Sequence, residues 1–212
     1  MRSWAAMVAV PLALEAALGG GPASAQDTSQ VIDLPAGYGA LNQDQISILF
    51  TAGDLQVRFL PLDERAIRMV GKDAYASLHG LVVSRQAQID SATQDAGIST
   101  PGLALVSFFA LRRDARFDPQ NLSLLYRNQY YRPAAIIPLT VNFSSHQLHL
   151  REQASAIYVF ELALPIFEEF DVDYAGTEST AWKDIVPVIL RERSRILSRY
   201  QASQTDSAGR KP

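Results

Sequence analysis

Among the residues that could do chemistry, His146 and His149 have the close spacing of a candidate metal-binding pair. They lie in a segment, HQLHLR (146–151), that alternates as a strand does, so residues three apart face opposite sides. The remaining histidine, His79, falls in a predicted helix, and the chain contains no cysteine. We therefore predict neither a metal site at these histidines nor a cofactor.

A second candidate is the acidic stretch that contains Asp171 and Asp173. Its sequence, DVDYAGTE, matches part of a calcium-binding loop, but the alternation of oxygen ligands stops at Ala175 and no bidentate glutamate follows at the expected distance. Glu169, Asp171 and Asp173 also share one face of a predicted strand, which is typical of a solvated surface. The sequence leaves open whether Asp171 and Asp173 bind calcium.

Motifs for covalent catalysis are missing from the sequence. There is no Gly-x-Ser-x-Gly turn for a serine nucleophile, and a chain without cysteine has no thiol nucleophile. Carboxylates are numerous enough to form a pair that cleaves glycosides, but nothing in the sequence selects one pair. We expect a non-catalytic protein.

The strongest candidate for binding is a cluster of tyrosine and arginine side chains. Both residue types are enriched where proteins meet partners, and planar aromatic rings also stack on sugars. The alternative is structural, because a tyrosine near the corner of a β-sandwich commonly packs on the core and hydrogen-bonds the backbone. The predicted partner-binding residues are Tyr126, Arg127, Tyr130, Tyr131 and Arg132.

A basic stripe is expected on the last helix, where Arg191, Arg195 and Arg199 recur every four residues. Such a stripe could contact an acidic partner or anionic lipid headgroups at a membrane surface. The alternative is a solvated face that is partly paired within the helix, because Glu192 lies three residues before Arg195.

The N-terminal residues 1–25 have the features of a cleaved signal peptide. An apolar run from Trp4 to Leu14 is followed by glycines and by the small residues Ala23-Ser24-Ala25, which predict cleavage before Gln26. That run is too short to span a bilayer, and no later segment resembles a transmembrane helix. A net charge of -3 argues against nucleic acid. We expect a periplasmic or secreted bacterial protein.

Hydrophobic periodicity predicts a mixed α+β fold. A hairpin (45–50 and 55–60) and a helix (73–96) precede an immunoglobulin-like antiparallel β-sandwich, and a C-terminal helix follows it. The predicted sandwich strands are 103–112, 122–127, 146–151, 155–162 and 167–174. The predicted regions are the N-terminal hairpin-plus-helix region (26–100), the sandwich (101–178), the helix (179–200) and a disordered tail (201–212).

The stretch YYRPAAIIPLT (130–140) has the composition of a buried strand, yet it contains Pro133 and Pro138. Proline cannot donate a backbone hydrogen bond, so we expect an edge strand in which Pro133 takes the first position and the nitrogen of Pro138 faces outward.

These observations predict an exported, non-catalytic binding or structural module with a protein partner in the bacterial cell envelope. The alternative is a carbohydrate-binding or carbohydrate-degrading envelope protein. No motif is specific enough to indicate a family.

Overall fold

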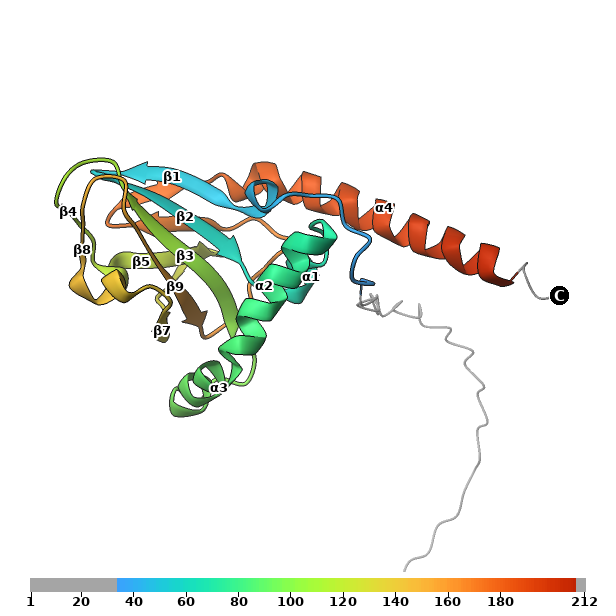
Figure 1. The fold of residues 1–212 in the computed structure, drawn as a ribbon, viewed down its shortest axis with the longest axis horizontal. Coiled ribbons are helices and arrows are strands. Elements are labelled where there is room, and N and C mark those ends of the chain that lie inside the picture. The colour runs from blue at the N-terminus through green and yellow to red at the C-terminus, as the bar shows by residue number, and fades with distance from the viewer. Residues whose placement is uncertain (1–33, 209–212) are drawn as a thin grey trace, which may run out of the picture. The chain divides into compact units, whose positions relative to one another are not determined.

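The computed structural model describes residues 34–208, and the predicted signal peptide lies outside the described residues. As predicted, the chain is a mixed α+β protein with antiparallel sheets and a C-terminal helix (Figure 1). The strands are β1 (Ile48–Ala52), β2 (Leu55–Pro61), β3 (Gly102–Ala110), β4 (Ala115–Arg116), β5 (Leu122–Tyr126), β6 (Gln129–Tyr131), β7 (Ala135–Pro138), β8 (Gln147–Leu148), β9 (Gln153–Phe160), β10 (Asp171–Tyr174) and β11 (Thr177–Ser179). The helices are η1 (Gln43–Ile46), α1 (Glu64–Ile67), α2 (Lys72–Ser84), α3 (Gln86–Asp95), η2 (Pro119–Asn121), η3 (Val141–Ser145) and α4 (Trp182–Ala208).

A five-stranded antiparallel sheet joins the two predicted regions. Its order is β1-β2-β3-β9-β7, so the N-terminal hairpin pairs directly with the first strand expected in the sandwich. Alternate residues of β3 point to opposite faces, and Val106 and Phe108 lie on the fully buried face. The helices α2 and α3 lie beside this sheet in Figure 1, and α3 contacts β7 and β9.

A four-stranded sheet, in the order β11-β10-β5-β6, supplies the other side of the core. Aromatic rings from the two sheets meet there: the centroids of Phe108 and Tyr174 are 5.2 Å apart. Phe59 of β2 lies 6.1 Å from Phe170, which in turn lies 4.7 Å from Trp182 at the start of α4. The core therefore joins both sheets to the last helix.

The single helix predicted over 73–96 is broken in two at Arg85. This residue adopts φ -111° and ψ 5°, ends α2 and precedes α3. The change of direction allows Leu78 of α2 and Ile89 of α3 each to be buried. The hydrophobic spacing is helical on both sides of the break, so periodicity alone does not reveal it.

The C-terminal helix is longer than predicted at its end. It runs from Trp182 to Ala208, so residues 201–208 of the predicted disordered tail are helical. Pro187 lies inside the helix rather than in its first turn, where proline is best tolerated. None of the helices in the described range 34–208 is both long enough and apolar enough to cross a membrane.

Two predicted strands are shorter than expected. The segment 146–151 contributes only β8, because His146 and Arg151 adopt left-handed backbone conformations with φ 55° and 66°. The segment 167–174 contributes only β10, since a turn bonds the N–H of Glu168 to the carbonyl of Pro165.

The proline-containing stretch 130–140 is an edge, but it is not one strand. Its first residues belong to β6, the last strand of the four-stranded sheet, and its later residues form β7, the last strand of the five-stranded sheet. Pro133 is buried between the two strands instead of opening one of them. Directly after β7, the Leu139 N–H donates to the Ser155 carbonyl at 2.9 Å, which leaves the nitrogen of Pro138 facing away from β9. The outward orientation of Pro138 is as predicted.

We expect Pro138→Val to change the free energy of unfolding by less than about 0.5 kcal/mol, because no ladder hydrogen bond is lost. The new N–H would complete the outer edge of β7, so self-association should increase. Urea denaturation and sedimentation velocity measure the two effects. Pro133→Val is the matched control and should destabilise the protein, since Pro133 is buried. A marked loss of stability in Pro138→Val would contradict the outward orientation.

Candidate partner-binding surface

The predicted tyrosine and arginine cluster lies on the hairpin formed by β5 and β6. Two residues, Arg127 and Asn128, make the turn, and both have positive φ angles, of 49° and 65°. This is the type I′ geometry, which favours asparagine or glycine. Arginine in this left-handed backbone conformation is strained by about 1 kcal/mol, and contacts made by its side chain can offset that strain.

Those contacts are made with Glu168, which lies far away in the sequence. The Tyr126 hydroxyl donates to Glu168 Oε2 at 2.6 Å, and Arg127 Nη2 donates to the same oxygen at 3.0 Å. The guanidinium of Arg127 also lies over the Tyr126 ring, 4.9 Å from its centroid. The three side chains hold the tip of the hairpin against the segment before β10.

Electrostatics fix the charge state of each group in this cluster. The hydrogen bond from Tyr126, and after it that from Arg127, hold the pKa of Glu168 below its ordinary range. The bond to Glu168 raises the pKa of both Tyr126 and Arg127. Glu168 is therefore a carboxylate between two donors at neutral pH.

Of the remaining predicted residues, Tyr130 and Arg132 are exposed, whereas Tyr131 packs against the core. Tyr130 is 59% exposed and lies opposite Leu125 on the outer face of the sheet. Tyr131 is half-buried, and its hydroxyl donates to Gln129 Oε1 at 3.1 Å, while Arg132 is exposed. The structure thus brings the five predicted residues together: four lie on the β5–β6 hairpin, and Arg132 directly follows it.

Other tyrosines perform the structural role that was the alternative for this cluster. The Tyr158 hydroxyl is buried and donates to the Pro119 carbonyl at 3.0 Å. Tyr174 accepts from the Asp118 N–H at 3.0 Å, and burial raises its pKa. Tyr130 makes no comparable contact in the described range, which distinguishes it from these core tyrosines.

Beside the hairpin tip lies a cavity of about 280 Å³, lined by Arg127, Glu169, Asp171 and Lys183 among others. Burial raises the pKa of Asp171, Lys183 opposes that rise and Glu169 adds to it. The other calcium candidate, Asp173, accepts from the Gly176 N–H at 3.3 Å. Within residues 34–208, no group of three or more histidine or acidic side chains is arranged to hold a metal ion.

The histidine pair does not share a continuous strand. His146 ends η3 in a left-handed conformation, and its ring lies 5.7 Å from that of Phe117. His149 follows β8, and its Nδ1 lies 3.5 Å from an Asp114 oxygen. The strand geometry assumed from the sequence was therefore wrong for these residues.

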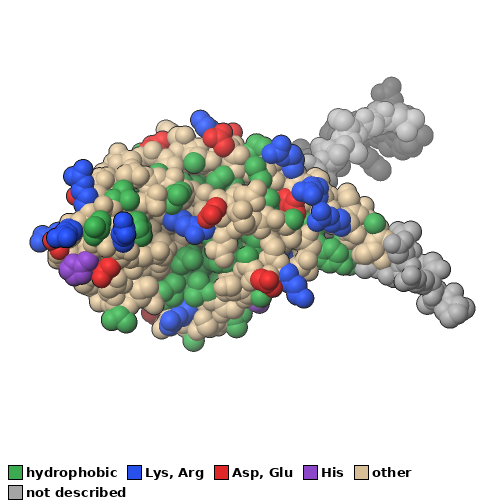
Figure 2. Space-filling model, turned by 45° about the horizontal axis from the view of Figure 1, so that its top comes forward, with side chains coloured by type: hydrophobic (Ala, Val, Ile, Leu, Met, Phe, Trp, Pro, Cys, Tyr) green, Lys and Arg blue, Asp and Glu red, His purple; other side chains and the backbone are tan. Residues whose placement is uncertain are grey.

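The predicted basic stripe on α4 is largely engaged within the molecule. Arg195 Nη1 lies 3.1 Å from Glu192, whose side chain is 2% exposed and whose other oxygen accepts from the Ala40 N–H at 2.9 Å. Arg199 donates to the Tyr38 carbonyl at 3.3 Å. Charged side chains of both signs are interspersed over the face shown in Figure 2. These contacts favour an internal role for Arg195 and Arg199.

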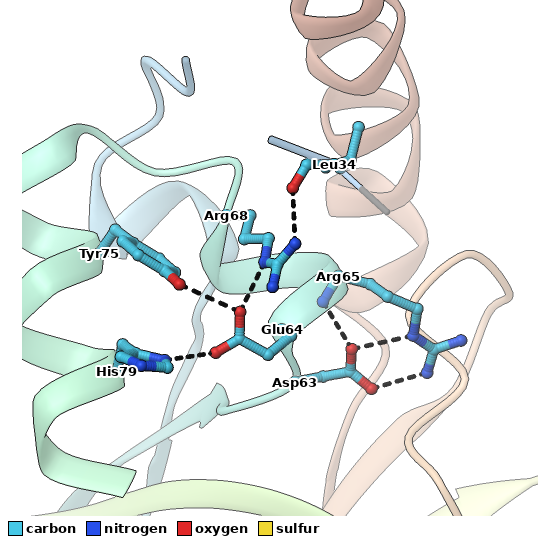
Figure 3. A network of polar contacts seen from close by, with 7 residues as sticks. All are labelled: Leu34, Asp63, Glu64, Arg65, Arg68, Tyr75 and His79. Atoms are coloured by element: carbon cyan, nitrogen blue, oxygen red, sulfur yellow. Dashed lines mark hydrogen bonds and ion pairs between the residues drawn. The ribbon is translucent and has the colours of Figure 1, made fainter. Parts of the chain in front are cut away.

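A polar network that the sequence analysis missed joins α1 to α2 (Figure 3). Glu64 is its centre: Oε1 lies 2.7 Å from His79 Nδ1, and Oε2 accepts from Arg68 at 2.7 Å and from Tyr75 at 3.3 Å. Arg68 also donates to the Leu34 carbonyl at 2.8 Å. The spacing of Glu64 and Arg68, four residues apart, is the one signal in the sequence that indicates part of this network.

We expect Glu64→Gln to lower the free energy of unfolding at pH 7 by up to about 1 kcal/mol. Burial raises the pKa of Glu64, but the hydrogen bonds from Arg68 and His79 outweigh it and lower the pKa below 4.5. A depressed pKa stabilises the fold above the unfolded value, and that stability is lost as pH falls through the folded value. Melting curves of both proteins should therefore converge in acid, once the pH falls below the folded pKa of Glu64.

Glu178→Gln is the matched control, because Glu178 is exposed and has no side-chain partner in the described range. It should melt like the wild type at both pH values. A difference between Glu64→Gln and the wild type that persists in acid would show that charge is not its cause.

A cavity of about 690 Å³ lies between the ends of the two sheets. Its polar lining includes Asp54, Asp114, Arg116 and Asp118. The aromatic residues in its wall, Phe117 and Tyr174, are almost fully buried, so neither ring presents an open stacking face. The cavity offers hydrogen bonds to a ligand, but no aromatic platform.

Comparison with protein-family models, with curated proteins and with solved structures found no match to this chain.

Proposed function

We propose that the protein is an exported, non-catalytic module that binds a protein partner in the bacterial cell envelope through the β5–β6 hairpin. The observation that carries the proposal is the exposed ring of Tyr130 on a hairpin whose tip is held by Arg127 and Glu168. An exposed aromatic residue on a rigid support loses little conformational freedom on binding, which favours affinity. Exposed Arg132 adds a charge at the same site.

A photo-crosslinker tests this surface in cells that express the full chain. We expect p-benzoylphenylalanine at position 129 to give a discrete protein adduct, and Tyr130→Ala to weaken that adduct. The control site is Leu49, which is 55% exposed on β1 at the far edge of the other sheet. Equal adducts from positions 129 and 49, or none from 129, would reject the proposal.

Export rests on the signal-like segment 1–25. We propose that the mature chain begins at Gln26 and is periplasmic or secreted. N-terminal sequencing of protein recovered from the envelope fraction tests this directly. An intact Met1 in that fraction would reject cleavage.

We further propose that the two sheets form an immunoglobulin-like sandwich. The ring contact between Phe108 and Tyr174 supports face-to-face packing of the sheets. An experimental structure that separates the sheets or places them edge to edge would reject this assignment.

The alternative, a carbohydrate-binding or carbohydrate-degrading protein, is favoured by one observation, the polar cavity of about 690 Å³. Carboxylates such as Asp54 and Asp114 could accept hydrogen bonds from sugar hydroxyls there. Calorimetric titration with envelope oligosaccharides tests this function. Binding that is lost in Asp114→Asn but retained in Tyr130→Ala would place a sugar in the cavity.

A further inference from the structure

The backbone of β6 leaves one hydrogen-bonding edge open. The strand is last in the order β11-β10-β5-β6, and its turn contains two residues. In such a hairpin Tyr126 and Gln129 form the hydrogen-bonded pair, and pairing then alternates along the ladder. Tyr130 therefore directs its N–H and carbonyl away from β5. Within residues 34–208, no backbone group outside this ladder bonds to them.

The neighbouring edge is partly blocked by comparison. In β7 the outward positions are Ile136 and Pro138, and Pro138 has no N–H to offer. Residues 127–132 contain no proline, so β6 keeps both a donor and an acceptor at its outward position. Of these two successive strands, β6 is the one whose outward edge is not interrupted by a proline.

We propose that β6 binds an extended, acidic segment of the partner protein, which adds to the four-stranded sheet as a further strand. This inference rests on the proposed function, for which it supplies the mode of binding. Strand addition obtains affinity from backbone hydrogen bonds and specificity from alternate side chains.

The exposed side chains define the chemistry of that segment. Tyr130 lies in β6 and Arg132 comes directly after the strand, so both exposed side chains lie at this edge. Arg132 makes no ion pair in the described range, whereas Arg127 is already neutralised by Glu168. The added strand should carry an apolar residue against Tyr130 and an acidic residue, two positions away, against Arg132.

A second copy of this chain fits the edge less well. Antiparallel pairing of two β6 strands about Tyr130 would place Arg132 opposite Asn128. Residues 127–132 contain no acidic side chain, so such a pair would leave both copies of Arg132 without a charge partner. Charge complementarity therefore favours an acidic partner segment.

The probe is a peptide with blocked ends in which threonine and valine alternate, and one glutamate lies two residues from the central valine. A control peptide has the same sequence with lysine in place of the glutamate. We expect saturable shifts of the Tyr130 and Arg132 amide signals in the labelled full chain, and slower hydrogen exchange at Tyr130. The lysine peptide should bind about 10-fold more weakly. Tyr130→Pro and Tyr130→Ala both lack the ring, but only proline lacks the N–H, so Tyr130→Pro should bind about 10-fold more weakly than Tyr130→Ala.

The outcomes separate this inference from the function on which it rests. Strand addition would be overturned by two results together: the glutamate peptide binds Tyr130→Pro and Tyr130→Ala equally well, and it leaves the hydrogen exchange of the Tyr130 amide in the wild type unchanged. If the adduct at position 129 persisted, the proposed function would stand. If that adduct were also missing, the proposed function would fail.

An adduct of twice the chain mass would identify a second copy of this chain as the occupant of the edge, and it would overturn the proposed acidic segment. Exchange is measured on the wild type, so it decides the question even if Tyr130→Pro is unstable.

Discussion

Replacing Trp182 with alanine should lower the free energy of unfolding by about 3–5 kcal/mol. The side chain is fully buried, and its ring lies 4.7 Å from that of Phe170. Phe170 in turn contacts Phe59 of β2, so the cavity would open where α4 meets the core of both sheets. Urea denaturation followed by circular dichroism measures the loss.

Trp182→Phe is the matched control. The indole Nε1 is buried and has no hydrogen-bond partner in the described range, so phenylalanine removes an unsatisfied donor while it keeps most of the ring contact. Its cost should be well below that of alanine. If both variants lost the same stability, ring packing on Phe170 would not be the source.

Changing Tyr130, Tyr131 and Arg132 together to alanine should weaken partner binding by more than about 2 kcal/mol, or roughly 30-fold. Tyr130 and Arg132 are exposed, and Tyr131 is half-buried, so only the loss of Tyr131 removes contacts with the core. We expect the melting temperature to fall only slightly. Recovery of the partner crosslinked at position 129 and thermal melting, measured on the same variant, give both quantities.

Leu49→Ala is the control for loss of an exposed apolar side chain, and it should alter neither measurement. An unfolded triple variant would make the three residues part of the core. A stable triple variant that recovers the partner as well as the wild type would leave this surface without a binding role.

Sequence reasoning succeeded where the chemistry of one residue decides its position. A missing N–H identified Pro138 as an outward-facing edge residue, whatever its partner strand. Alternation in 55–60 identified β2 and the buried face of Val57 and Phe59. The composition of Tyr130 and Arg132 indicated an exposed cluster because such residues seldom gather together in a core.

The remaining features depend on partners that are distant in the sequence. Glu168 completes the hairpin cluster from a segment that local patterns assigned to a strand. The stretch 130–140 is divided between two sheets because β6 pairs with β5, whereas β7 pairs with β9, and both halves have similar strand propensity. The sequence indicates that Glu192 belongs to a charged face of the last helix. In the structure its side chain is buried and accepts a hydrogen bond from the Ala40 N–H.

The bond between Glu192 and Ala40 also bears on when the chain can fold. It joins residues 152 positions apart, and the Arg199 contact with the Tyr38 carbonyl spans 161 positions. Neither contact can form until Glu192 and Arg199 have left the ribosome, and such distant contacts slow folding. The segment around Ala40 therefore remains without these two hydrogen bonds until α4 has formed, and α4 completes the fold.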